Sequence, residues 1–381
     1  MALILGIESS CDETSAAVVR DGAQVLSNVV SSQIATHAPY GGVVPELASR
    51  EHLRAIVPVV REALQRAKVE MKAIDALAVT QGPGLAGALL VGITYAKALA
   101  FALSKPLISV NHLEGHIHAV LLEHRQTHSE ELPMPSLALV VSGGHTHLYR
   151  VDRTVQGWKY QNVGRTLDDA AGEAFDKVAK LLGLAYPGGP IIEQLALHGN
   201  PQAIAMPRSQ IKARQKKHAR GEEFEAASES YDFSFSGIKT SVLRFVESHA
   251  MKPAIAERQH SLSAVENPTV EDYLAHCDRL TLDLIASFQE AVVQDLVAKT
   301  LNAAQKFEVE ALIVTGGVAA NSRLRSQFVE RAEREGLRVF FPSRGLSTDN
   351  AAMIAAAAYP NFLAGTFAEE HFSAEASMRL G

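Results

Sequence analysis

Two histidines four residues apart, His112 and His116, are the residues whose type and spacing most directly indicate chemistry in this sequence. They open a segment with a helical pattern, where four-residue spacing places both imidazoles on one face, one turn apart. That geometry allows two histidines to hold one metal ion. Glu114 points away from this face, whereas zinc proteases place a glutamate directly after the first histidine. The pair therefore predicts a metal site and argues against a zincin-type protease; histidines packed or solvated without a metal are the alternative.

The predicted helix that carries these histidines belongs to an order of elements that occurs twice along the chain. Each round gives three strands in a meander, a helix, then strand, glycine turn and helix, then strand and helix. The first round predicts strands over residues 3–7, 14–20, 24–31, 75–80 and 107–110. The second round predicts strands over residues 136–141, 145–151, 158–163, 312–315 and 339–341. The sequence therefore predicts an α/β protein of two similar lobes that face each other across a cleft.

The lobe boundaries follow from this repeated order. We predict an N-terminal lobe over residues 1–134, joined by the C-terminal segment 349–381, and a C-terminal lobe over residues 135–348. Two charged or polar insertions are expected in the second lobe, near residues 210–230 and 250–270. The main helices of that lobe are predicted over residues 168–182, 191–198, 236–248 and 273–307.

Asp349 stands at the start of the last predicted helix, in the place that His112 occupies in the first round. If the two halves face each other, these two helix N-termini meet near a pseudo-two-fold axis. Asp349 then becomes the natural third ligand of a metal held by His112 and His116. Aspartate is also a favoured residue for capping a helix N-terminus, so a capping role is the alternative.

Three glycine turns follow predicted strands or approach the cleft, at Ser142-Gly143-Gly144, Gly188-Gly189 and Gly316-Gly317. Glycine lets the backbone come close to a phosphate and offer its N–H groups as donors. Together the turns predict a nucleotide cleft, although each one alone is only a turn. Asp176 and Glu193 lie near them and could bind hydroxyls of a ribose, with a solvated acidic face as the alternative. The chain has no Walker A pattern and no GxGxxG in the context of a dinucleotide fold.

Composition excludes several classes of protein. The chain has 381 residues with 47% hydrophobic and 20% charged residues, as expected of a core-forming globular protein. Its formal net charge of −6 gives no global sign of nucleic-acid binding. Two cysteines make no disulfide framework, so we expect a reducing, cytoplasmic compartment. We expect no secretory signal and no apolar run long enough to span a bilayer.

Seven segments taken together resemble the TsaD/Gcp/YgjD family, the tRNA N6-adenosine threonylcarbamoyltransferases. They are ESSCDET at 8–14, YGGVVPELASR at 40–50, HLEGH at 112–116, VSGGHT at 141–146, DDAAGEAFDK at 168–177, DFSFSG at 232–237 and TDNA at 348–351. The resemblance covers nearly the whole chain. It implies the duplicated actin/hexokinase/Hsp70-like (ASKHA) fold, which agrees with the repeated order of elements.

The resemblance also implies the reaction and its site. The family moves a threonylcarbamoyl group from threonylcarbamoyl-AMP to N6 of the adenine next to the anticodon, on the 3′ side, in tRNAs that read codons beginning with A. A divalent metal, iron(II) with zinc as the alternative, is implied on His112, His116 and Asp349. The implied substrate contacts are Val140, Val141, Ser142, Gly143, Gly144, Asp176, Gly189, Glu193 and Asn321. Glu13 is a candidate for orienting the substrate or accepting a proton.

The implied partners are tRNA, an inactive sister subunit of the same fold (TsaB-like) and a P-loop ATPase (TsaE-like), with no membrane. A basic stretch from Arg208 to Arg220 is a candidate for binding tRNA phosphates, and a solvated linker is its alternative. Two other functions remain open at this point. A sugar-kinase-like ATP-binding enzyme would share the fold without needing His112 and His116, and a silent scaffold would need neither the histidines nor Asp349.

Overall fold

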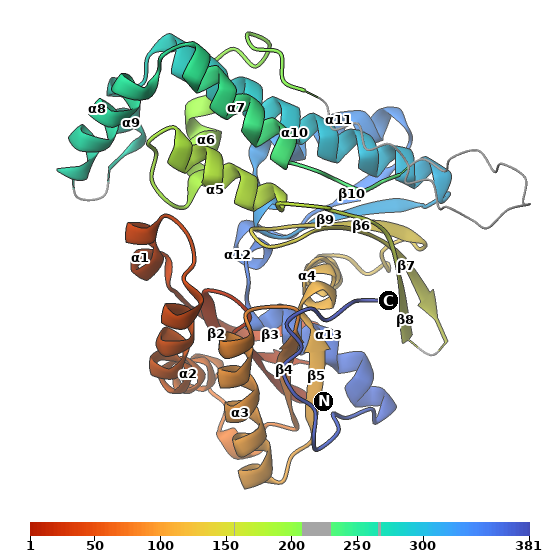
Figure 1. The fold of residues 1–381 in the computed structure, drawn as a ribbon. Coiled ribbons are helices and arrows are strands. Elements are labelled where there is room, and N and C mark those ends of the chain that lie inside the picture. Colours follow the sequence, from red (N-terminus) through yellow and green to blue (C-terminus); the bar gives the residue numbers. More distant parts are fainter. Residues whose placement is uncertain (156, 208–229, 266–267) are drawn as a thin grey trace, which may run out of the picture.

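Two five-stranded mixed sheets with the same topology form the framework of the protein (Figure 1). The computed structural model describes residues 1–381 except residue 156, residues 208–229 and residues 266–267. The first sheet has the order β3-β2-β1-β4-β5, and the second has the order β10-β9-β6-β7-β8. In each sheet three strands form an antiparallel meander, and two further strands join parallel to its first strand. The predicted duplicated fold is confirmed.

The strands lie where the hydrophobic patterns predict them. In the first sheet they are β1 Leu3–Glu8, β2 Glu13–Arg20, β3 Gln24–Ser32, β4 Ala76–Gly82 and β5 Leu107–Asn111. In the second sheet they are β6 Ser136–Val141, β7 Thr146–Thr154, β8 Gly157–Arg165, β9 Ala311–Thr315 and β10 Arg338–Phe340. The parallel strands are almost wholly apolar because both faces of each sheet are covered.

One face of each sheet carries helices of its own half. On the first sheet these are α2 Pro45–Ala67 and α3 Ala86–Leu103, which pack on Leu5, Ile7, Leu77 and Val79. On the second sheet they are α5 Ala171–Leu181, α6 Gly188–Ala196, α7 Ser236–Ser248, α10 Arg279–Lys306 and α11 Ser322–Arg334. Alternate residues of β6 divide between the two faces: Leu137 and Leu139 contact these helices, whereas Ala138 and Val140 face the other way.

The inner face of each sheet is covered by a helix that follows the other sheet in the sequence. α4 His112–Thr127 follows β5 of the first sheet but packs its Leu113, Ile117 and Leu121 against the second sheet. α13 Ala351–Ala364 follows the second sheet but packs on the first, and α4 and α13 contact each other between the sheets (Figure 1). This exchange brings the N-terminus of each helix to the junction of the halves.

Several boundaries differ from the sequence expectations. The helix expected over residues 273–307 is two helices, α9 Val270–Ala275 and α10, because Asp278 caps a new helix by accepting from the Thr281 N–H. The helix expected from residue 168 begins at Ala171. The expected insertion at 250–270 contains α8 Lys252–Ser263. The insertion near 210–230 and the basic stretch from Arg208 to Arg220 lie almost wholly or wholly outside the described residues.

The α3 helix corrects the expectation about apolar runs. Among the described residues it is the one helix long and apolar enough to cross a membrane by length and composition, with a mean hydropathy of 1.7. In the structure it is a partly covered outer helix. Ala88, Leu89, Ile93 and Ala96 are buried in the core of the first sheet, while Leu90 and Phe101 are exposed.

Candidate active site

The two histidines of α4 lie on one buried face at its first turn, as their spacing predicts. Asn111, the last residue of β5, caps the helix by accepting from the Leu113 N–H at 2.9 Å. His112 is 2% exposed and His116 is fully buried. Their rings meet edge to face with centroids 4.7 Å apart. The strand end therefore fixes the helix start, and the helix start fixes both imidazoles.

Asp349 reaches both histidines from the other half of the chain. Its Oδ1 lies 3.2 Å from His116 Nε2 and 3.6 Å from His112 Nε2. One ligand atom from each of the three residues lies within 4.8 Å of the others, which is a plausible arrangement for one metal ion. The predicted set of His112, His116 and Asp349 is brought together by the fold.

The capping alternative for Asp349 is wrong. Asn350 is the N-cap of α13, and its Oδ1 accepts from the Met353 N–H at 3.1 Å. The next residue is also fixed, because the Ala351 N–H donates to Ser15 Oγ at 2.9 Å. Asp349 thus lies just outside a helix that is anchored to the first sheet, and its carboxylate is left for the histidines.

The residues present fit a metal. Both nitrogens of the His116 ring are buried with no partner in hydrogen-bonding geometry, although Nε2 is close to Asp349. A buried polar atom left unsatisfied is unfavourable by about 1–3 kcal/mol, and a metal bond would remove that penalty. Two imidazoles and one carboxylate form a donor set suited to iron(II) or zinc.

The charges at the site favour a cation. Burial alone would lower the pKa of His112, but Asp349 and Glu8 outweigh it and raise the pKa to about 9. For Asp349, burial is likewise outweighed by His112 and His116, which hold its pKa below the usual range. The buried carboxylate of Glu8 and the partly buried carboxylate of Asp349 therefore both face the imidazole of His112, an arrangement that attracts positive charge.

Glu13, the candidate catalytic residue, begins β2 at the edge of this cluster. Burial and the neighbouring Asp12 raise the pKa of its carboxyl well above the ordinary value. Its Oε1 accepts from Ser32 Oγ at 3.4 Å. Asp12 in turn accepts from the Tyr186 hydroxyl at 3.4 Å, a contact that joins the two halves beside the site. No direct contact of Glu13 with His112, His116 or Asp349 is present among the described residues.

The backbone of the turn after β6 is accessible to a ligand. Val140 and Val141 are fully buried, with side chains that belong to cores on opposite faces of the sheet, so only their backbone could contact a ligand. Gly143 and Gly144 are exposed, and a Cβ at either would meet nothing within 4 Å. The Ser142 carbonyl accepts from the Gly172 N–H at 3.1 Å, which seats the turn against the start of α5.

The three polar side chains predicted to contact substrate also hold helix ends together. Asp176 accepts from the Gly188 N–H at 2.7 Å, and burial raises its pKa to about 6 despite this bond. Glu193 accepts from the backbone N–H and hydroxyl of Ser322 at 2.9 and 2.6 Å. Asn321 caps α11 and donates to Gln289 at 2.9 Å. All three belong to the second lobe, as does Gly189, where no atom lies within 4 Å of the position of a Cβ.

Two residues near the metal ligands were missed by the sequence analysis as individual site residues. Glu8 is fully buried and faces His112. His145 lies in the turn after β6, with its ring centroid 5.7 Å from that of His112. Burial and the neighbouring His112 lower the pKa of His145 to about 3, so its ring is neutral at pH 7. Both stand in motifs that resemble the family, and this was the signal that could have found them.

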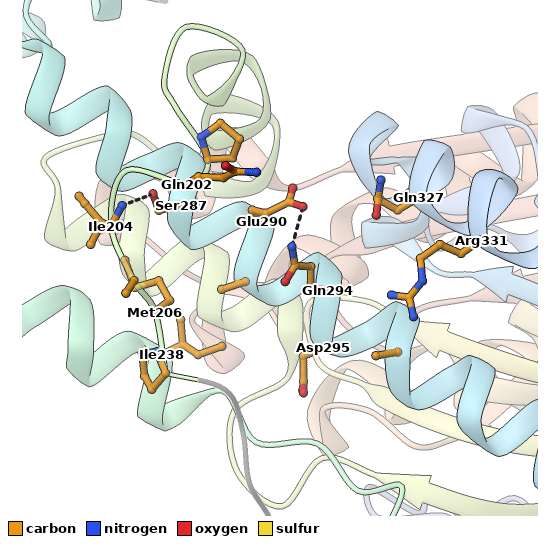
Figure 2. Close-up of a pocket in the computed structure, with 15 residues that line it drawn as sticks. Gln202, Ile204, Met206, Ile238, Ser287, Glu290, Gln294, Asp295, Gln327 and Arg331 are labelled. Atoms are coloured by element: carbon orange, nitrogen blue, oxygen red, sulfur yellow. Dashed lines mark hydrogen bonds between the residues drawn. The ribbon is translucent and has the colours of Figure 1, made fainter.

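A separate hollow on the second lobe holds none of the predicted site residues. It has a volume of about 520 Å³ and lies along α10 and α11, beside residues 201–207 (Figure 2). Ser287, Glu290 and Gln294 line it from α10, where Gln294 donates to Glu290 at 3.0 Å. Gln289, which contacts Asn321, is absent from its lining. The hollow is therefore distinct from the site around His112.

The fold and the three-residue cluster define a class: two-lobed proteins of the actin/hexokinase/Hsp70-like type with a candidate metal centre where the lobes meet. A solved structure of full-length HypF in a phosphate- and nucleotide-bound form has a TM-score of 0.55 at 13% identity, over 96% of this chain and 47% of that one. At that identity the likeness supports the fold alone.

Sequence comparison identifies the family. The model of the TsaD family, described as tRNA N6-adenosine threonylcarbamoyltransferase, matches residues 24–356. The enzyme of that name from Koribacter versatilis is 64% identical over 100% of this chain and 99% of its own length. The one from Syntrophotalea carbinolica is 52% identical over 93% and 90%. The chain belongs to the TsaD family, and its activity is the transfer of a threonylcarbamoyl group to N6 of adenosine in tRNA, forming t6A. This membership decides against the sugar-kinase and scaffold alternatives.

Proposed function

We propose that threonylcarbamoyl transfer takes place beside His112, His116 and Asp349, which hold one divalent ion, iron(II) with zinc as the alternative. The observation that carries this proposal is the position of the Asp349 Oδ1 atom, which comes from the other half of the chain and lies 3.2 Å from His116 Nε2 and 3.6 Å from His112 Nε2. When bound, such an ion supplies a Lewis acid that polarises the carbamoyl oxygen.

The chain's own residues would bind and orient the donor, threonylcarbamoyl-AMP. The exposed backbone of Gly143 and Gly144 is suited to the AMP phosphate, because glycine permits close approach and N–H donation. Gly189 and the carboxylates of Asp176 and Glu193 are suited to the ribose. The leaving AMP would then depart toward donors already in place, which is how a preorganised site lowers a barrier. Glu13, whose raised pKa favours the protonated form, would orient the threonyl part or exchange a proton with it.

The acceptor is proposed to be the adenine adjacent to the anticodon on its 3′ side, in tRNAs reading codons that begin with A. Its N6 is a weak nucleophile held in a stacked base, so the base must leave the stack to reach a site between two lobes. A cytoplasmic location belongs to the same proposal. It is supported by Cys11 and Cys277, which are both free thiols.

Reconstitution tests the proposed centre directly. Unmodified tRNA, threonine, bicarbonate and ATP are combined with the partner proteins and either the wild type or His112→Ala, and t6A is measured by mass spectrometry. We expect the variant to form t6A roughly 10²- to 10³-fold more slowly, because several kcal/mol of carbonyl activation are lost. Equal rates from both proteins would contradict the metal mechanism.

We also propose that the inactive sister subunit docks on the outer face of α2 and α3, and that a P-loop ATPase joins the complex. Support comes from exposed apolar side chains: Leu53 is 65%, Val57 37% and Leu90 47% exposed. A Cβ at Gly87 would meet Ser49 Oγ, so the two helices touch one turn before Leu53 and Leu90. A partner of the same fold would offer an equivalent helix pair to cover this face.

The change Leu90→Glu is expected to weaken the complex with the sister subunit at least tenfold, because it buries a charge in an apolar contact. Leu197→Glu is the control, since Leu197 is 70% exposed on the second lobe. Titration calorimetry of each variant with the purified sister subunit gives the dissociation constants. If both variants bind as the wild type does, this face is not the docking surface.

A further inference from the structure

Glu8 is the last residue of β1, at the carboxyl end of a strand of the first sheet. Its side chain is fully buried in the described structure, and β1 and β4 run parallel with Ile7 opposite Val79. This register places Glu8 beside Thr80, the next residue of β4. The ends of these two strands face the first turn of α4, which carries His112.

Every oxygen of this carboxylate has a partner. Oε1 accepts from the Ser10 N–H at 2.5 Å, and Oε2 accepts from Thr80 Oγ1 at 2.7 Å. Oε2 also lies 3.2 Å from His112 Nδ1, and the Ser10 hydroxyl lies 3.2 Å from the same nitrogen. These hydrogen bonds hold the side chain in one orientation, with Oε2 directed at His112 Nδ1.

A carboxylate can only accept, so the proton between the two groups belongs to His112 Nδ1. In a metal-bound His112 the Nε2 atom would supply the lone pair, and it is Nε2 that lies 3.6 Å from Asp349 Oδ1. His116 has no equivalent support, since its Nδ1 is buried without a partner. The two histidines of the cluster are therefore held differently: His112 by a hydrogen-bonded carboxylate, and His116 by packing.

We propose that Glu8 is a positioning residue of the metal centre, which fixes the tautomer and orientation of His112 so that Nε2 points at the ion, and that Thr80 fixes Glu8. Carboxylates that accept from the second nitrogen of a metal-bound histidine raise its basicity, and their loss typically weakens metal binding 10- to 100-fold. This inference rests on the proposed metal centre. It predicts that Glu8 increases the metal affinity of His112 in addition to orienting its ring.

Metal affinity is the decisive readout. The dissociation constant for Zn²⁺ is measured on the full chain by competition with a fluorescent chelator, for wild type, Glu8→Gln, Glu8→Ala and Thr80→Val. We expect Glu8→Ala to bind roughly 10- to 100-fold more weakly, and Glu8→Gln, which keeps an acceptor without the charge, to fall between Glu8→Ala and wild type. Thr80→Val should weaken binding by a smaller factor, because it only frees the carboxylate to move.

Glu290→Gln separates a specific effect from general damage. Glu290 is also a largely buried carboxylate, and it binds Arg323 at 2.8 and 3.0 Å outside the cluster. Its loss should lower the melting temperature and leave the zinc affinity unchanged. A second readout follows the ring itself: ¹⁵N chemical shifts of His112 in the zinc-bound protein should report a protonated Nδ1 in the wild type and a mixture of states in Glu8→Ala.

The possible failures can be told apart. If the wild type binds zinc through His112 and the folded Glu8 variants bind it within twofold of the wild type, the positioning role is overturned while the metal centre stands. If Glu8→Ala does not fold, Glu8→Gln and Thr80→Val decide by the same criterion. If the wild type binds no zinc that depends on His112, the proposed centre fails and the role of Glu8 fails with it.

Discussion

Asp349→Asn is expected to remove the bound metal and reduce t6A formation roughly 10²- to 10³-fold while leaving the fold intact. The change keeps the size of the side chain but removes the carboxylate of the candidate ligand set formed with His112 and His116. Stability should change little because Asp349 does not cap α13. Metal content by mass spectrometry, t6A rate and thermal melting of the same preparation measure the three effects.

Asn350→Ala is the matched control, since it changes the adjacent residue and has the opposite expectation. Loss of the cap should lower the free energy of unfolding by about 1 kcal/mol, and the metal should remain. The two neighbours thus separate a ligand from a cap by opposite results. An Asp349→Asn protein that retained metal and activity, but melted early, would reverse the assignment.

Gly6→Ala is expected to impair the site from a distance. Gly6 lies in β1 beneath α13, where a Cβ would come 2.3 Å from the Ala351 carbonyl oxygen and 3.0 Å from Ala355 Cβ. Neither neighbour is the flexible end of a side chain, so the helix itself must move. We expect a loss of about 1–3 kcal/mol in the free energy of unfolding. Because Asp349 immediately precedes this helix, metal affinity should fall at least tenfold as well.

Gly237→Ala controls for the same substitution without the contact. Gly237 is exposed in the first turn of α7, with no atom within 4 Å of its Cβ position. Alanine there should be neutral or stabilise the helix by up to about 1 kcal/mol. Chemical unfolding and zinc titration are run on both variants. Wild-type affinity in a destabilised Gly6→Ala protein would show that α13 can shift without displacing Asp349.

Much of the fold could be predicted because local patterns agree with it. The apolar strands Leu3–Glu8 and Ser136–Val141 are bounded by turn residues, and the four-residue spacing of His112 and His116 survives unchanged on α4. The third ligand also followed from the repeated order of elements, since that order placed Asp349 opposite His112. The repeated order of elements thus predicted the long-range contact between Asp349 and His112, which residue spacing alone does not predict.

Other features depended on contacts that no local pattern carries. Asp349 and Asn350 are both good caps by residue type, and only the position of α13 on Ser15 decides between them. Glu8 has the pattern of a strand residue near a turn, and its role depends on the register that places Thr80 beside it. The pattern of residues 270–306 predicts one continuous helix. It is divided into two because the Asp278 side chain accepts from the Thr281 N–H and so starts a new helix.

The crossing over of α4 and α13 has a consequence for how the protein must assemble. The inner face of the first sheet is covered by α13 and that of the second sheet by α4, so neither half alone can complete the core on its inner face. During synthesis from the N-terminus, the inner face of the first sheet would stay uncovered until residues 351–364 are made, which form the last long helix. His112 and His116 therefore gain Asp349 only after this last helix has been made, and a bound ion would link the two halves of the folded chain. The halves produced as separate polypeptides should accordingly be unstable apart and recover a native core when mixed.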